Sequence, residues 1–166
     1  MYDDAHISCV VTGEGTGHGG APGTRSSGGG HGGGGGKGID QIRTGAPFGS
    51  FLQPRSFGCD GGYSTFPYRG GAGGGRLSIE VSDWLTIDGQ VSASGGRGVS
   101  PHSGGGSGGS VFVRTSHITG AGIIDASGGD GEKSGGGGGS AGRIALYYVY
   151  DFYVGKSVRM DLRKLQ

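Results

Sequence analysis

Gly104-Gly105-Gly106-Ser107-Gly108-Gly109 runs directly into Ser110-Val111-Phe112-Val113 in this chain. The first run has almost no side chains, and the second is rich in the β-branched and aromatic residues that favour strands. Glycine in bulk is typical of flexible linkers, of collagen, of low-complexity tracts and of folds whose backbones approach too closely for a Cβ atom. The sequence around this junction decides among these possibilities.

Glycine accounts for 46 of the 166 residues and is gathered in blocks. Further blocks lie at 28–36, 70–75 and 135–139. Collagen is excluded, because no strict Gly-X-Y period holds and the chain has only 5 prolines. Apolar residues make up 31% of the chain, so we expect thin apolar layers and a large share of backbone hydrogen bonding.

The second half of the chain repeats. Similar units begin at Gly75, Gly109 and Gly142, about 33 residues apart, and such self-similarity is typical of stacked units that cannot bury a face alone. Apolar and polar residues alternate within each unit, as in strands. We predict that apolar residues of the first two units stack as successive layers. They are Leu77, Ile79, Leu85 and Ile87 in the first unit, and Val111, Val113, Ile118 and Ile123 in the second.

These patterns predict an all-β fold: a solenoid-like stack of short strands, of the parallel β-helix type, with packed glycine-rich segments of the polyglycine or polyproline-II kind and no helices. No stretch keeps a 3.6-residue apolar period, and glycine blocks interrupt every candidate helix. We expect a single module over 1–166, with a glycine-rich part at 1–75 and the β repeats at 76–166. Strand-like sequence begins almost at once, which favours a fragment of a longer chain.

The N-terminal glycine blocks allow two states. As a linker this region would be disordered, but it carries aromatic islands and a cysteine, which favour an ordered, packed state. In that state glycine backbones lie side by side, and their N–H and C=O groups bond laterally. We therefore expect the 28–36 block to be packed, and a Cβ atom at Gly33 to hold the chains apart.

The chain has two cysteines, Cys9 and Cys59, and each lies beside a strand or turn signal. They are either two unrelated buried thiols or one disulfide that pins the N-terminal strand to the glycine-rich region. A chain with so small a core has reason to need a covalent staple. Such a bond would place the protein in an oxidising, extracellular setting.

Motifs for catalysis or metal binding are weak in this sequence. Two G-x-S-x-G matches, centred on Ser107 and Ser140, lack the strand-to-helix turn and the positioned His and acid of a nucleophile elbow. The histidines show no paired metal spacing, which predicts exposed loop positions for them. We expect no enzyme activity, no catalytic residues, no metal and no cofactor. The five histidines are His6, His18, His31, His102 and His117.

The charge balance excludes further classes of function. A net charge of +1 offers no field for nucleic acid or for an anionic membrane. No apolar run nears the roughly 20 residues of a membrane-spanning helix. We expect neither nucleic-acid binding nor membrane insertion.

An ordered string of motifs resembles a glycine-rich repeat module found in large secreted or surface proteins of marine invertebrates, with similar modules in bacteria and plants. The resemblance covers nearly the whole chain, implies an extracellular, multidomain context, and carries no catalytic residues. A weaker likeness is to the glycine-rich region of anaplastic lymphoma kinase receptors, where glycine helices pack in a ligand-binding ectodomain. The motifs are His18-Gly19-Gly20, Phe48-Gly49-Ser50, Phe57-Gly58-Cys59-Asp60-Gly61-Gly62, Gly73-Gly74-Gly75-Arg76-Leu77, Leu85-Thr86-Ile87-Asp88-Gly89-Gln90-Val91-Ser92-Ala93, Ser103-Gly104-Gly105-Gly106-Ser107-Gly108-Gly109-Ser110 and Gly142-Arg143-Ile144-Ala145-Leu146-Tyr147-Tyr148.

Two functions follow from the sequence. The first is a structural or adhesive element of an extracellular matrix or fibre, whose partners are other copies of itself or neighbouring modules. The alternative is a module of a surface receptor or adhesin that binds a protein or a glycan. For the alternative, the candidate binding surface is the aromatic C-terminal cluster Tyr147, Tyr148, Tyr150, Phe152 and Tyr153.

Overall fold

The computed structural model describes residues 25–39, 43–63 and 69–148 and the backbone of three two-residue strands: β1 (Ile7–Ser8), β2 (Thr16–Gly17) and β10 (Arg159–Met160). Within these residues there is no helix, which agrees with the predicted all-β class. β1 and β2 pair antiparallel. The other strands are β3 (Arg76–Glu80), β4 (Trp84–Thr86), β5 (Gln90–Ser92), β6 (Ser110–Arg114), β7 (His117–Thr119), β8 (Ile123–Asp125) and β9 (Arg143–Tyr147).

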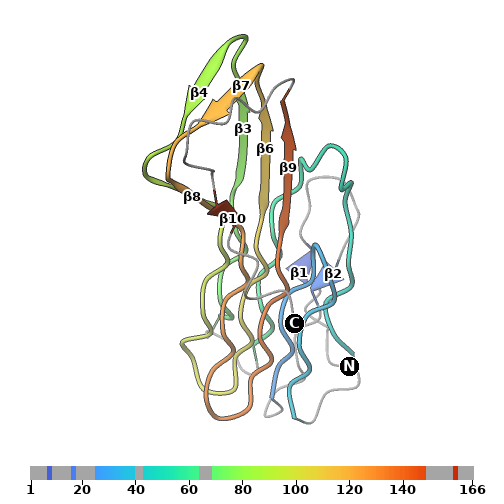
Figure 1. The fold of residues 1–166 in the computed structure, drawn as a ribbon. Coiled ribbons are helices and arrows are strands. Elements are labelled where there is room, and N and C mark those ends of the chain that lie inside the picture. The colour runs from blue at the N-terminus through green and yellow to red at the C-terminus, as the bar shows by residue number, and fades with distance from the viewer. Residues whose placement is uncertain are drawn as a thin grey trace.

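Strands of successive repeats lie side by side in three small parallel sheets (Figure 1). Their orders are β3-β6-β9, β4-β7 and β10-β8-β5. Every pair is in register, so equivalent residues of neighbouring repeats face each other. The predicted layers Leu77 with Val111, Ile79 with Val113, and Leu85 with Ile118 are confirmed by this register. The described residues do not show a closed solenoid coil.

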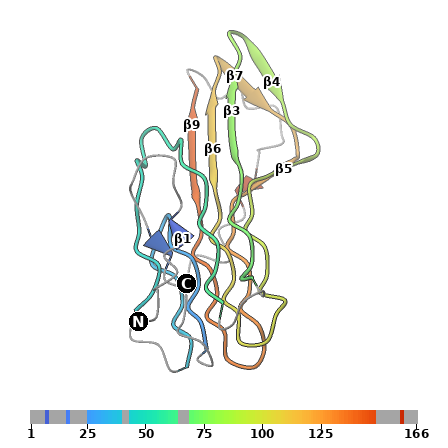
Figure 2. The ribbon, with the colours of Figure 1, turned by 180° about the vertical axis from the view of Figure 1, so that it is seen from behind.

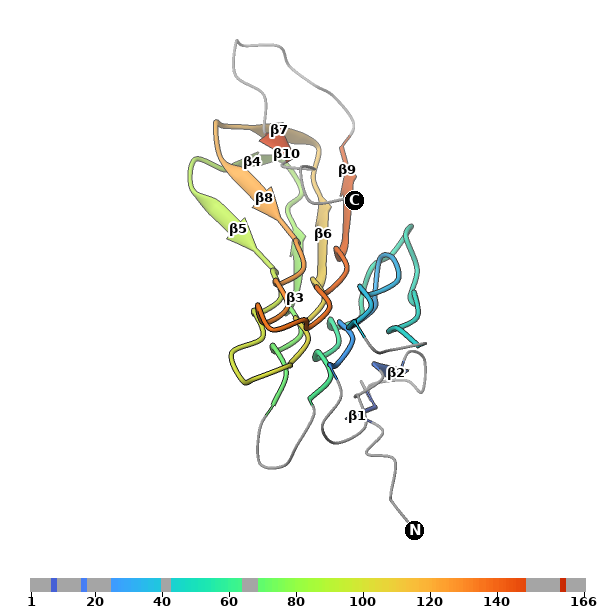
Figure 3. The same cartoon turned by 90° about the horizontal axis from the view of Figure 1, so that it is seen from below.

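A thin apolar core lies between the sheets. In Figure 3, β5 and β8 face the β3-β6-β9 sheet. Alternation points every second side chain of each strand inward. The middle strand of the large sheet is therefore buried most completely, because repeats cover it on both sides. Its core residues Val111 and Val113 are 0% and 1% exposed. The buried cluster consists of Ile87, Ala93, Val111, Val113, Ile124 and Ala126.

One predicted layer residue is wrong. Ile123 is 42% exposed and pairs with Gln90, whereas its neighbour Ile124 is fully buried and pairs with Val91. Adjacent residues of a strand point to opposite faces. With two isoleucines in succession, apolar character alone does not say which of them faces the core.

The glycine blocks pack side by side beneath the strands (Figure 1), around the central segment 104–109. The whole run 103–113 is buried. Each N–H of the central segment donates to a different segment from its neighbours, and the partner segment recurs at every third residue. The acceptors are Gly62 and Cys59 in one segment, Gly137 and Ser140 in a second, and Gly96 and Ala93 in a third, at 2.7–2.9 Å.

The carbonyl groups of the central segment receive donors from further segments. Gly71 and Gly74 donate to Gly104 and Ser107, at 2.8 Å each. Gly29 donates to Gly105, and Gly129 donates to Gly106. A partner that recurs every third residue is the result of a helix with three residues per turn and no internal hydrogen bonds, as in polyproline II. The central segment is thus held by backbone on all sides.

This packing depends on the missing Cβ atoms. A Cβ on Gly106 would overlap the carbonyl of Ala72, and one on Gly105 would overlap that of Gly129. The expectation for Gly33 is wrong, because a Cβ there meets only the Cβ of Ser140, at 4.0 Å. Gly33 lies in a bend where an added Cβ atom has room, as it has at Gly34, whereas at Gly32 and Gly35 it would overlap backbone.

We expect Gly106→Ala to lower the free energy of unfolding by at least about 1–3 kcal/mol, because its methyl group has to displace backbone that is already hydrogen-bonded. Gly33→Ala is the matched control. It should leave stability unchanged or raise it by about 0.4–1 kcal/mol, by restricting the unfolded chain. Urea unfolding of both variants measures the difference. Equal stability of the two variants would contradict the close-packed arrangement.

Candidate functional site

An open groove of about 590 Å³ lies on the outward face of the large sheet, beside β9. The alternation that sends Val111 and Val113 inward sends Phe112 and Arg114 to this face. The bend at 51–53 folds back over the sheet and forms the opposite wall. The groove is lined by Leu52, Gln53, Phe112, Arg114, Thr115, Leu146, Tyr147 and Tyr148.

Tyr147 ties the two walls of the groove together. Its hydroxyl donates to the carbonyl of Leu52 at 2.7 Å, and its ring packs on Phe112 with centroids 5.6 Å apart. Phe112 is 6% exposed and forms the floor. Two of the lining residues present groups suited to a ligand. The ring of Tyr148 is 48% exposed, and the guanidinium of Arg114 has no hydrogen bond or ion pair in the part of the chain that the structure describes.

The structure brings together part of the predicted binding surface. Tyr147 and Tyr148 both line the groove, whereas Tyr150, Phe152 and Tyr153 lie outside the described residues. The sequence reasoning missed Arg114 and Phe112. Strand alternation places these two residues on the face opposite to the core, and this alternation could have identified them. The sequence carries no signal that the 51–53 bend folds back over the sheet.

A buried histidine, His31, lies among the glycine segments. His31 is 0% exposed, which corrects its prediction as an exposed loop residue. Its Nδ1 lies 2.7 Å from the carbonyl oxygen of Gly108. A carbonyl only accepts, so Nδ1 carries the proton. The ring stacks on Phe48 with centroids 4.7 Å apart. His31 thus supplies a side-chain donor to the central segment where the other carbonyls receive backbone donors.

Burial lowers the pKa of His31 below its usual value of 6.5. The bond to the Gly108 carbonyl opposes this shift, and the guanidinium of Arg143 adds to it. Its Nε2 is buried with no hydrogen-bond partner in the described residues. Protonating Nε2 would therefore place a second cation near Arg143 inside the packed backbone.

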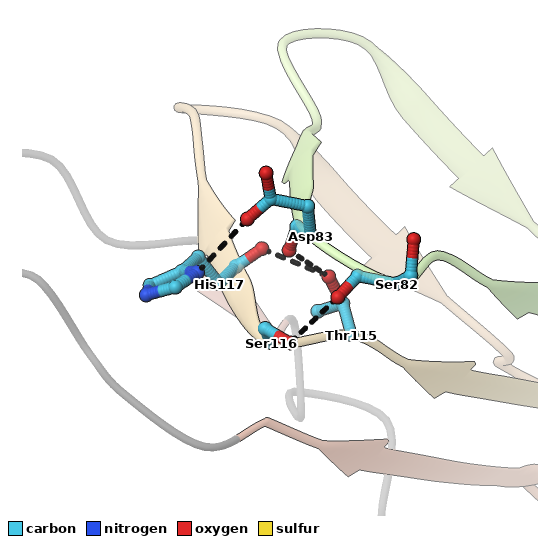
Figure 4. A network of polar contacts seen from close by, with 5 residues as sticks. All are labelled: Ser82, Asp83, Thr115, Ser116 and His117. Atoms are coloured by element: carbon cyan, nitrogen blue, oxygen red, sulfur yellow. Dashed lines mark hydrogen bonds and ion pairs between the residues drawn. The ribbon is translucent and has the colours of Figure 1, made fainter.

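A second polar cluster joins the corners of the first two repeats (Figure 4). Asp83 lies 3.6 Å from Nδ1 of His117, whose ring stacks on Trp84. Thr115 donates to the carbonyl of Asp83 at 2.9 Å. The hydroxyl of Ser116 donates to the carbonyl of Ser82 at 2.7 Å and does not face the imidazole, so this cluster ties repeat to repeat.

The serines of the two G-x-S-x-G matches also serve the backbone. Ser107 Oγ accepts from the N–H of Cys59 at 2.7 Å, and Ser140 Oγ accepts from the N–H of His31 at 2.8 Å. Within the described ranges, no group of three or more His, Cys, Asp or Glu side chains is placed to hold a metal ion. The same residues include no helix of the length and apolarity that a membrane span requires.

Cys59 is 1% exposed, and its sulfur is not a free thiol. No disulfide pair is found among the described residues, and Cys9 lies outside them. The bond between Cys9 and Cys59 stays a prediction.

We expect the buried His31 to make stability depend on pH. Its pKa is lower in the folded state, so below about pH 6.5 the unfolded chain binds a proton that the folded chain does not. The contribution of His31 should be constant above pH 7, and it should lower stability progressively as the pH falls below about 6.5. The Glu132 carboxyl, whose pKa the Ser134 hydroxyl lowers to about 2, acts at lower pH.

Thermal unfolding between pH 5 and 8 tests this expectation. His31→Asn should flatten the slope of Tm against pH, whatever its effect on Tm itself. His102→Asn is the control, because Asn tolerates the positive φ of 63° at that position. An unchanged slope in the His31 variant would show that another group is responsible.

Comparisons with known proteins give no relative for this chain. No family model matches it, and neither the curated proteins nor the solved structures contain a match.

Proposed function

We propose that this chain is a non-catalytic structural or adhesive module of an extracellular protein. One observation carries the proposal: much of the buried interior is backbone, held by hydrogen bonds to segments on several sides, and the apolar core beside it is thin. Such an arrangement provides a rigid body. Two of its buried serines, Ser107 and Ser140, are engaged in hydrogen bonds with the backbone.

The repeats support the same proposal. Each adds a strand in register to the sheets, so the module is extended by adding units, as in a solenoid-like stack. The predicted disulfide between Cys9 and Cys59 belongs to the same proposal, since lasting disulfides are found in oxidising compartments.

Pulling single molecules by their ends tests the mechanical role. With the module placed between two marker domains, we expect a distinct unfolding event under force, and the Gly33→Ala variant should retain it. Gly106→Ala should lower the unfolding force, because backbone contacts around the central segment are lost. Smooth extension of the unmodified module, without an unfolding event, would contradict a load-bearing role.

A second candidate function is the binding of a protein or glycan in the groove. It is favoured by the guanidinium of Arg114, which has no partner among the described residues, beside the exposed ring of Tyr148. A planar guanidinium matches a carboxylate or sulfate, and an aromatic ring offers an apolar face with a polar tip. The groove therefore suits a ligand that carries an anionic group next to an apolar or ring surface.

Binding to an array of acidic oligosaccharides and acidic peptides tests this candidate. For any ligand found, Arg114→Gln should weaken binding by about tenfold or more, the loss expected for a hydrogen bond to a charged group. Arg97→Gln, at an exposed arginine outside the groove, is the control. Equal loss in both variants would assign the binding to general charge rather than to the groove.

A further inference from the structure

All three strands of the first repeat lie at the edge of their sheets. β3 is the end strand of β3-β6-β9, β4 borders only β7, and β5 is the end strand of β10-β8-β5. Figure 2 shows β3 and β9 at opposite edges of the large sheet. Within the described part of the chain no strand pairs with the outer edge of β3, β4 or β5. One end of the molecule is therefore an open face made of three strand edges.

Only alternate residues of β3 form backbone hydrogen bonds with β6. Gly75 accepts from Ser110 and Val81 donates to Arg114, so the odd-numbered residues of this strand bond to β6. In a parallel ladder, alternate residues bond to opposite neighbours. The N–H and C=O groups of Arg76, Ser78 and Glu80 therefore point to the open edge. An edge of this kind is a template for pairing with another strand.

Several side chains on this open face are less buried than their equivalents in the second repeat. Leu77 is 37% exposed although its partner Val111 is 0% exposed, and Trp84 at the edge of the next sheet is 52% exposed. At the corner, Ser116 donates to the carbonyl of Ser82 in the repeat before it, while the equivalent hydroxyl of Ser82 has no partner in the described residues. The first repeat therefore presents, on its open face, the same kinds of contacts that the second repeat makes to the first.

We propose that this open face binds the β9 edge of a second copy of the chain, in parallel and in register, so that copies add head to tail. The proposal rests on the structural role argued above and names the partner. β9 continues the apolar ladder: Ile144 follows Val111 and Leu146 follows Val113. In the assembly Ile144 of one copy lies beside Leu77 of the next, as Val111 does within the chain, and Leu146 lies beside Ile79.

One pairing in this register brings two cations together. Arg76 and Arg143 would be opposite each other, but both guanidinium groups are already turned onto the 48–57 segment. Arg76 donates to the carbonyl of Arg55 at 3.1 Å and lies over the ring of Phe57, 5.3 Å from its centroid. Arg143 donates to the carbonyl of Phe48 at 3.1 Å. Both cations therefore already have partners within their own copy.

Disulfide cross-linking between two variants tests the register. In the assembly, Ser78 of one copy lies opposite Ala145 of the next. Within one chain the two residues flank Phe112, two strand spacings or about 9.5 Å apart, which is beyond the roughly 7 Å limit for a disulfide. Ser78→Cys protein mixed with size-tagged Ala145→Cys protein should form the mixed dimer under mild oxidation. Neither variant should form a dimer alone.

A proline variant provides the second measurement. Ser78→Pro removes an N–H that faces the open edge and leaves the bonds to β6 intact, so the chain should fold with an unchanged Tm. Its sedimentation should show monomer at concentrations where the unmodified protein forms oligomers. Ile79→Pro, which removes a bond to β6, should instead lower Tm.

Each outcome decides the proposal. Mixed dimers only, together with a monomeric Ser78→Pro variant, support head-to-tail addition. Dimers of Ser78→Cys alone would mean that two β3 edges meet, and a monomeric unmodified protein would mean that the face stays open; either overturns the proposal. A module that shows an unfolding event under force but stays monomeric would leave the structural role intact and remove only the self-association.

Discussion

The close approach of backbone to backbone, allowed by the absence of Cβ atoms, is the constraint on which this structure depends. The N–H and C=O groups of segment 104–109 form hydrogen bonds with segments from both the N-terminal and the C-terminal parts of the chain. Because these neighbours are far apart in sequence, the segment holds distant parts of the chain together. The central segment also aligns the strands above it, because β6 begins at the residue after the segment ends.

Three side chains in the glycine region take the place of a backbone hydrogen-bond partner. Ser107 and Ser140 accept from backbone N–H groups, and His31 donates to the carbonyl of Gly108. These residues interrupt glycine runs in the sequence, and the structure gives each interruption a hydrogen-bonding reason. The titration of His31 consequently acts on the same backbone that positions the strands and the wall of the groove.

The strand ladder was predictable, because Leu77, Ile79, Val111 and Val113 carry an alternation that fixes which face is buried. Two successive isoleucines at 123 and 124 carry no such information, and the prediction chose the exposed one. Within the glycine blocks the sequence has no side-chain pattern to set a register, so neither the central place of 104–109 nor the room around Gly33 could be read from it. At the groove, Tyr147 and Tyr148 were predicted, but Arg114 joins them only because the 51–53 bend folds back over the sheet.

A centre built from peptide groups has a thermal consequence. Unfolding of an ordinary core exposes mainly apolar surface, which raises the heat capacity, whereas exposure of peptide groups lowers it. In this chain the two contributions oppose each other more nearly than in a protein with a full side-chain core. The heat-capacity change per residue is then small, and the curve of stability against temperature is broad and shallow. Such a module keeps a similar stability in cold and in warm surroundings.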